Sequence, residues 1–237
     1  MAVSARSSLL PILLFACGIA QASAQEITEF VLPAGGIPSG ITAGPDGNVW
    51  FTVPDSQHYS GSISRITFGG VLTQFPRLNP APSFIVTGPD GNLWFTQDDS
   101  CDDGISSIGR ITPAGVVTQF GQPNCRLLGD IAVGSDGNLW FTWISLNPPF
   151  PAGISRRRLA GAGEVTEFPV PGRSGGITAG PDGALWFTEG VLDRIGRITT
   201  TGVVTEFPVP TVGAGLGGIA AGPDGNLWFT ETVGNKI

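Results

Sequence analysis

The sequence predicts an all-β protein, a β-propeller made of four-stranded antiparallel blades with about five repeats present. The first observation is a signature of the form Gly-Pro-Asp-Gly-Asn-Leu-Trp-Phe-Thr, which recurs every 42 to 46 residues, beginning at Gly44, Gly88, Gly134, Gly180 and Gly222. The second is one tryptophan at the same place in each copy: Trp50, Trp94, Trp140, Trp186 and Trp228. Units of this length that hold two hairpins are typical of propeller blades. A β-solenoid or a tandem of small domains fits the spacing less well.

Each repeat reads as four short strands joined by turns. In the first repeat, the first three strands are predicted at residues 41–43, 49–52 and 63–66. Pro45-Asp46-Gly47 separates the first two, with proline presetting φ and glycine taking the positive-φ position. The fourth strand is clearest in the second repeat, at 116–120, after a glycine-containing link. Two hairpins per repeat therefore predict a small antiparallel sheet.

The tryptophan column explains why such sheets should stack. Trp50 and Phe51 are adjacent, and adjacent residues of a strand face opposite sides of the sheet. The second strand is thus apolar on both faces, and each sheet needs a cover on both sides. Burying a tryptophan removes about 150–250 Å² from water, a gross gain of roughly 4–6 kcal/mol per repeat before entropy. A succession of blades supplies both covers, whereas a two-layer sandwich supplies one.

Composition narrows the class of protein. The chain has 237 residues, 36 glycines, 20 prolines and a formal net charge of −7. Many tight turns and few helices follow from the glycine and proline content. An acidic chain without a basic stripe argues against nucleic acid and against an anionic membrane surface as partners. After residue 24 no stretch is long and apolar enough to span a bilayer. We expect the protein to be a monomer.

The first 24 residues are typical of a secretory signal peptide. Arg6 precedes an apolar stretch, and Ala22-Ser23-Ala24 forms a small-x-small cleavage site. The alternative is lipidation at Cys17, for which Phe15 is bulky. We therefore expect residues 1–24 to be removed, residues 25–237 to form the propeller domain, and the protein to be secreted or periplasmic.

Both ends of the propeller domain look incomplete. Ile237 corresponds to the first residue of a third strand, so we expect the sequence to stop inside a blade as a fragment. Thr28-Glu29-Phe30 repeats the fourth-strand motif without the three strands that should precede it. In propellers such an unpaired fourth strand often completes the last blade. The sequence does not decide between a five-bladed ring and a larger one.

The repeat resembles that of the virginiamycin B lyase (streptogramin lyase) family. The resemblance is carried by residues 180–189, by Arg194-Ile195-Gly196-Arg197-Ile198 and by Thr205-Glu206-Phe207, and it extends over nearly all of 26–237. It implies a seven-bladed propeller, here incomplete by roughly two repeats. It also implies a lyase that opens the ester of a cyclic peptide antibiotic by elimination, with magnesium, and hence a small cyclic peptide as partner and a role in antibiotic resistance.

The family places its catalytic histidines just before the first strand and a glutamate just after the second strand, in the last blades. An antiparallel pair brings these two places together. In this sequence the position just before the first strand, called the first column, is occupied in the five repeats by Ser39, Ser83, Gly129, Gly175 and Gly217, without a histidine. The position just after the second strand, called the second column, is occupied by Val53, Gln97, Trp143, Glu189 and Glu231. Glu189 and Glu231 therefore match the family's catalytic position, although the family also has glutamate there in blades without a catalytic role.

Other residues suggest sites of their own. Cys101 and Cys125 fall in loops that open on the same side of the sheets, and a disulfide between them suits an oxidising compartment. Carboxylates that could hold calcium gather around Cys101, although a solvated acidic loop is the preferred interpretation: Asp98, Asp99, Asp102 and Asp103. His58 and the run Arg156-Arg157-Arg158 are interpreted as solvated, and the arginines that recur in the third strands as structural.

Two further functions stay open beside the lyase. The empty histidine column and the long, varied loops after the second strands suit a secreted propeller that binds a ligand or protein through one loop face. A calcium-dependent hydrolase of the lactonase type is the third. Fold alone cannot decide among them.

Overall fold

The computed structural model describes residues 27–32, 37–55, 59–98, 106–121, 126–147, 149, 151–161 and 163–237, with the side chain of Asp98 left aside. The chain divides into two units, Met1–Leu32 and Pro33–Ile237. In the first unit, residues 27–32 form neither helix nor strand. In the second unit the described residues are all β, without a helix that could cross a membrane.

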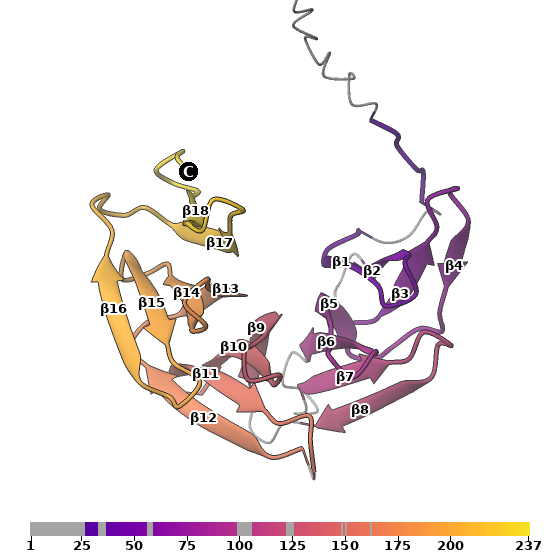
Figure 1. The fold of residues 1–237 in the computed structure, drawn as a ribbon, viewed down its shortest axis with the longest axis horizontal. Helices are drawn as coiled ribbons and strands as arrows, with labels where there is room; N and C mark the ends of the chain where they lie inside the picture. The colour runs from indigo at the N-terminus through magenta and orange to yellow at the C-terminus, as the bar shows by residue number, and fades with distance from the viewer. Residues whose placement is uncertain are drawn as a thin grey trace, which may run out of the picture. The chain divides into compact units, whose positions relative to one another are not determined.

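The described strands form successive antiparallel sheets in chain order, four of four strands and one of two, and Figure 1 shows them from indigo to yellow. The first two sheets contain β1 (Ile41–Ala43), β2 (Val49–Pro54), β3 (Gly61–Ile66), β4 (Leu72–Gln74), β5 (Ala81–Thr87), β6 (Leu93–Asp98), β7 (Ser107–Ile111) and β8 (Val117–Gly121). The third contains β9 (Arg126–Val133), β10 (Leu139–Ser145), β11 (Ala152–Arg157) and β12 (Val165–Val170). The last two contain β13 (Ser174–Ala179), β14 (Leu185–Glu189), β15 (Arg194–Ile198), β16 (Val204–Pro208), β17 (Leu216–Ala221) and β18 (Leu227–Glu231). The prediction of four-stranded antiparallel blades is confirmed.

The signature loop between the first two strands of a sheet is held by its aspartate. In the first sheet, Asp46 accepts hydrogen bonds from the Trp50 indole nitrogen at 2.8 Å, from Asn48 and from Arg65. Burial raises the pKa of Asp46, but these hydrogen bonds outweigh it and lower the pKa to about 2. Gly47 completes the turn with a φ of 75°. The repeated Asp-Gly pair is thus a turn device that also fixes the tryptophan.

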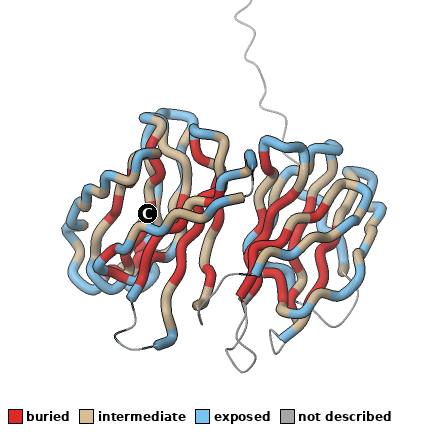
Figure 2. Tube along the Cα trace, turned by 90° about the horizontal axis from the view of Figure 1, so that it is seen from below, coloured by how far each residue is buried: buried red, intermediate tan, exposed pale blue. Residues whose placement is uncertain are grey.

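Tryptophan and phenylalanine of each second strand face opposite neighbours, as predicted. Trp140 packs with Leu185 and Phe187 of the following sheet. On the other side of the same strand, Phe141 packs with Trp94 of the preceding sheet. Figure 2 shows the resulting buried residues running along the strands between sheets. Trp228 is 52% exposed, and among the described residues no further sheet packs against β17 and β18 on that side.

Contacts made by arginines of the third strands also join neighbouring sheets. The Arg156 guanidinium donates to the Thr200 carbonyl of the next sheet at 2.8 Å. Arg65 does the same to the Pro113 carbonyl at 3.3 Å. Gly202, in the β15–β16 turn, touches the Phe168 ring, which stacks on Trp140. Arg65 thus has the structural role between sheets that the sequence indicated, and Arg156, interpreted from the sequence as solvated, makes a contact of the same kind.

Threonines of the second strands form a second repeated set of contacts between sheets. In three sheets the threonine after the Trp-Phe pair donates to a carbonyl at the start of the next sheet: Thr52 to Ser83 at 2.6 Å, Thr142 to Gly175 at 3.1 Å and Thr188 to Gly217 at 2.9 Å. These threonines are fully buried. They fix the starts of β5, β13 and β17 against the previous sheet, and these starts carry residues of the first family column.

Two sequence expectations are wrong. Thr28-Glu29-Phe30 forms no strand in the described residues. Arg157 is not solvated: it is 7% exposed and lies 4.1 Å from the centre of the Phe120 ring of the preceding sheet. Its stem and guanidinium cover an aromatic face instead of water, which a run of three arginines does not reveal.

Candidate functional site

The end of each second strand lies beside the start of the first strand of the same sheet. Glu189 pairs with Ser174, Gln97 with Pro82, and Glu231 with Leu216. This register brings the two family columns to one edge of the sheets, as expected for antiparallel neighbours. We take this edge in the third, fourth and fifth sheets as the candidate site.

Gln97 shows what this position does when it is structural. Its side-chain amide donates to the Pro80 carbonyl at 2.5 Å. Its carbonyl oxygen accepts from the Ser107 hydroxyl and from the Gln119 amide, both at 2.9 Å. The side chain is completely buried, so all its polar atoms are used inside the protein.

Glu189 occupies the same position in the fourth sheet with different partners. It is 0% exposed, and one carboxylate oxygen accepts from the Gly172 backbone N–H at 3.1 Å. Its other oxygen has no hydrogen-bond partner. Burial raises the pKa of Glu189, and the neighbouring Glu206 carboxylate raises it further, against the Gly172 hydrogen bond and the Arg194 charge. The structure thus places a buried carboxyl with a raised pKa where the family has glutamate.

Replacing Glu189 with glutamine is expected to stabilise the protein at neutral pH and to have no effect under acidic conditions. The folded state holds this pKa above its ordinary value of 4.5. Its stability contribution is therefore fully present below that value and is lost as the pH rises through the folded pKa. Denaturant midpoints of both proteins measured from about pH 4 to pH 8 check this.

Gln97→Glu is the reciprocal control for that prediction. A carboxylate cannot donate to the Pro80 carbonyl, so this variant should lose roughly 1–3 kcal/mol at neutral pH. A Glu189→Gln variant that is less stable than the parent at pH 8 would contradict the interpretation of Glu189.

Glu231 and Trp143 complete the second column. Glu231 is 7% exposed, and its unpartnered oxygen lies 3.9 Å from the Lys236 ammonium. Trp143 is buried beneath the Arg126 guanidinium, which lies 3.8 Å from its ring centre. Arg126 is itself paired with Glu167 at 2.6 Å. Neither column contains an imidazole, so no histidine base faces these carboxyls from the opposite column.

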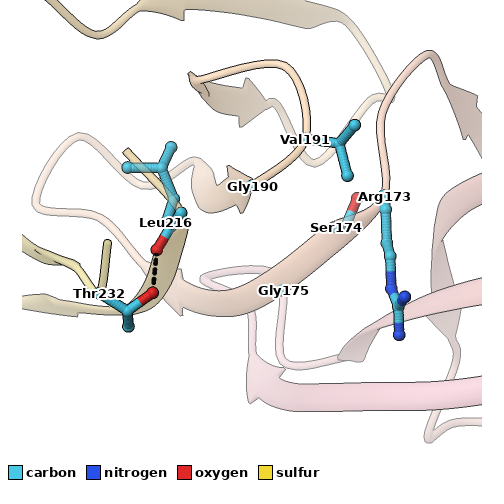
Figure 3. Close-up of a pocket in the computed structure, with 8 residues that line it drawn as sticks. Arg173, Ser174, Gly175, Gly190, Val191, Leu216 and Thr232 are labelled. Carbon is cyan, nitrogen blue, oxygen red and sulfur yellow. Dashed lines mark hydrogen bonds between the residues drawn. The ribbon is translucent and has the colours of Figure 1, made fainter. Parts of the chain in front are cut away.

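Two cavities lie at this edge, on either side of Ser174. The first, of about 230 Å³, lies between the fourth and fifth sheets (Figure 3) and is lined by Arg173, Ser174, Gly175, Gly190, Val191, Gly215, Leu216 and Thr232. The second, of about 150 Å³, lies between the third and fourth sheets and is lined by Leu127, Leu128, Gly129, Trp143, Ile144, Arg173 and Ser174. Glu189 and Glu231 line neither cavity. Arg173 and Ser174 line both.

Sequence reasoning missed Asp130, a carboxyl in the first strand of the third sheet. Its two oxygens accept from the backbone N–H of Ile131 at 2.8 Å and of Ile177, in the next sheet, at 3.0 Å. Burial raises the pKa of Asp130 despite both hydrogen bonds. The sequence contains a signal for it, because Asp130 is the one charged residue at the position that follows the first column. The other repeats have Gly40, Phe84, Gly176 and Gly218 there. Its contacts make Asp130 a clamp between two sheets.

Several predicted sites lie outside the described residues. Cys101, Cys125, His58, Asp99, Asp102 and Asp103 are among them, as is the side chain of Asp98. The disulfide and the solvated acidic loop, with calcium binding as its alternative, therefore stay predictions. Within the ranges that are described, no three His, Cys, Asp or Glu side chains gather as a metal site would require.

Comparison with known proteins identifies the repeat. The model of the virginiamycin B lyase family matches residues 19–174 and 131–237, which together span most of the chain. The chain belongs to the virginiamycin B lyase family. The resemblance on which the sequence analysis relied is thereby confirmed.

Solved structures agree with this membership. Virginiamycin B lyase from Staphylococcus aureus is 38% identical, with a TM-score of 0.74 over 87% of this chain and 67% of that one. A catalytically inactive histidine-to-alanine variant of the same lyase, with quinupristin, is also 38% identical, with a TM-score of 0.76 over 90% of this chain and 70% of that one. A streptogramin B lyase is 30% identical, with a TM-score of 0.63 over 85% of this chain and 78% of that one. No curated protein matches the chain.

Proposed function

We propose that the protein is a streptogramin lyase, a carbon–oxygen lyase that opens the ester of a cyclic depsipeptide by elimination. The observation that carries the proposal is 38% identity, over 90% of the chain, to a virginiamycin B lyase whose structure includes quinupristin. Identity of this extent goes beyond the fold. It makes the same class of substrate, a small cyclic peptide, the first candidate.

The proposed reaction needs a base and a place for the departing carboxylate. The base removes a proton from the carbon next to a carbonyl, and the electron pair of that C–H bond forms a double bond to the adjacent carbon. As this double bond forms, the C–O bond of the adjacent carbon breaks, and both of its electrons leave with the ester oxygen as a carboxylate. No water is consumed, so the opened peptide has the mass of the ring.

The described columns limit which residues can take part. Glu189 and Glu231 stand at the family's glutamate position, but both are buried and outside the two cavities. No histidine stands in the opposite column. The proposal therefore places the base outside these two columns, in repeats that would follow them in a seven-bladed ring.

Magnesium enters the proposal from the family alone. The described residues do not fit a magnesium site, because no three acidic or histidine side chains come together among them. The unpartnered oxygens of Glu189 and Glu231 belong to different sheets. No step above is routed through the ion, and residues outside the described ranges would have to hold it.

Export is part of the proposal as well. We expect residues 1–24 to direct secretion and to be removed, which places the propeller domain, residues 25–237, in an extracytoplasmic compartment. An enzyme there would meet the cyclic peptide before the peptide enters the cell.

Ring opening can be measured by incubating the full-length protein, including the repeats in which the proposal places the base, with quinupristin and magnesium chloride and following the products by mass spectrometry and chromatography. The lyase proposal predicts a product that has the mass of the intact ring, a different retention time and a new conjugated double bond. Chelation with EDTA should abolish it. A product heavier by one water would instead show a hydrolase, and an unchanged ring at equimolar protein would reject the lyase. Binding without opening would favour the non-catalytic propeller.

A further inference from the structure

Arg157 is a charged residue at a position that the other four-stranded sheets fill with isoleucine. It pairs with Leu139 at the start of the second strand of its sheet. The residues that pair in the same way elsewhere are Ile66, Ile111 and Ile198. Ile111 and Ile198 are completely buried, and Arg157 is only 7% exposed. The third sheet therefore buries a cation where the equivalent positions are apolar.

The turn that follows Arg157 is longer than its counterparts. The Arg158 N–H donates to the Glu164 carbonyl and closes this turn, whereas in the fourth sheet the Thr199 N–H donates to the Val203 carbonyl. The third sheet thus has two additional residues between its third and fourth strands. They change what lies over the preceding sheet.

The Arg157 guanidinium covers the phenylalanine of the preceding sheet. At the junction of the third and fourth sheets a glycine of the short turn has this role, since Gly202 lies against the Phe168 ring. Here the guanidinium lies 4.1 Å from the centre of the Phe120 ring. Because a glycine turn is enough to cover the ring elsewhere, this cover does not by itself account for a charged residue.

The guanidinium has no partner for its charge in the part of the chain that the structure describes. Its Nε atom is buried without a hydrogen-bond partner. The two terminal nitrogens also lack a hydrogen bond or ion pair, but, unlike Nε, they are not closed off from water. Burial lowers the pKa of Arg157, and no carboxylate acts against burial. An aromatic face compensates for only part of the desolvation of a cation, so a counter-charge is missing.

A glycine leaves space beside one of these terminal nitrogens. A Cβ atom on Gly163 would lie 2.6 Å from Nη2 of Arg157. Gly163 has a φ of 72°, which favours glycine. The same turn is exposed at Ala160 and Gly161. The free end of the guanidinium thus lies beside an exposed turn.

The charges of this turn favour a carboxylate over a phosphate. A guanidinium and a carboxylate match through two parallel hydrogen bonds. Glu164 is 70% exposed and lies 3.5 Å from the Arg158 guanidinium, so these two charges offset each other. One positive charge, that of Arg157, is left, and the Glu164 carboxylate nearby opposes a ligand with two negative charges.

We infer that Arg157 is the binding residue of a carboxylate site between the second and third sheets, which takes a carboxylate-bearing ligand from solution. The site lies away from the two family columns. Arg157 is opposite Leu139, where β10 begins, whereas the columns meet where the second strands end. The inference therefore does not depend on the proposed lyase.

Nuclear magnetic resonance of the arginine Nε–H groups tests the site in the unaltered protein. The titrants are sodium acetate, sodium phosphate and sodium chloride at equal ionic strength. The Nε–H signal of Arg157 should shift and saturate with acetate, and should need a several-fold higher concentration of phosphate. The signals of Arg65 and Arg156 should not move, because Arg65 is paired with Asp46 at 3.0 Å and Arg156 donates to the Thr200 carbonyl.

Arg157→Ile gives the third sheet the residue of its neighbours and is the matched variant. Replacing an unpaired buried cation with an apolar residue should leave the protein folded and at least as stable as the parent in chloride. Acetate should raise the denaturant midpoint of the parent, because a ligand that binds only the folded state stabilises it. In Arg157→Ile binding should weaken at least about tenfold and this rise should vanish. Arg157→Lys should retain part of it.

An Arg157 signal that does not respond to acetate, or responds equally to chloride, would overturn the inference. A folded Arg157→Ile variant with the acetate effect of the parent would do the same. Phosphate that binds more tightly than acetate would refute the carboxylate as ligand. An Arg157→Ile variant that is less stable than a parent insensitive to acetate would show that the guanidinium only covers Phe120. Ring opening of quinupristin enters none of these measurements, so its failure would leave the site intact.

Discussion

Replacing Trp140 with alanine should lower the free energy of unfolding by about 3–5 kcal/mol, the cost typical of removing a large aromatic side chain from a core. Trp140 is 0% exposed. It packs between its own sheet and Leu185 and Phe187 of the next, and stacks on Phe168 with ring centres 5.5 Å apart. Its loss opens a cavity between two sheets instead of one inside a sheet. The denaturant midpoint followed by circular dichroism measures the effect.

Trp228→Ala is the matched control, because Trp228 has the same place in its repeat. Its indole nitrogen keeps the hydrogen bond to Asp224, at 3.3 Å, but 52% of the residue is exposed and no sheet covers it. We expect a loss below about 1 kcal/mol. Equal losses in the two variants would show that packing within one sheet, and not contact between sheets, accounts for the effect.

Gly202→Ala should destabilise the protein by roughly 2–4 kcal/mol through backbone strain and overpacking together. Gly202 has a φ of 94°, which favours glycine. A Cβ atom there would lie 2.2 Å from the Phe168 ring of the preceding sheet. That ring is held between Trp140 and this turn, so it cannot move aside without loss of the stacking. Thermal or denaturant unfolding checks the prediction.

Gly47→Ala separates the two causes. Gly47 has a similar φ of 75°, but an added Cβ would meet nothing within 4 Å. It should therefore show the backbone cost alone, about 1–2 kcal/mol. If both variants lose the same stability, the close approach between neighbouring sheets contributes nothing.

Much of the fold could be predicted because it depends on local patterns. The strand at 41–43 begins and ends as predicted, and the Asp-Gly turn at 46–47 forms with glycine at positive φ. The adjacent Trp50 and Phe51 are buried as the period of two requires. Repetition added certainty, since each repeat is an independent instance of the same pattern.

Contacts between sheets could not be read from the sequence. Arg157 covers Phe120, and Asp130 accepts from Ile177, across 37 and 47 residues of chain. Which side chain meets which neighbour depends on the register of two sheets, and a column of residues in one repeat does not contain that information.

The candidate site was predicted in position and only partly in content. The meeting of the two columns followed from antiparallel pairing: Glu189 pairs with Ser174, which directly precedes Gly175 of the first column. Glu189 itself matched the family by position, but its burial and its Gly172 hydrogen bond depend on the loop before β13. The cavities on either side of Ser174 arise from gaps between sheets, for which the sequence has no marker.

The central claim is that the tryptophan column joins each sheet to the next, and exchange of the indole N–H protons with deuterium tests it most directly. In nuclear magnetic resonance spectra, the indole protons of Trp50, Trp94 and Trp140 should be protected to nearly the global free energy of unfolding, while that of Trp228 exchanges quickly. Fast exchange at all four tryptophans would contradict the account.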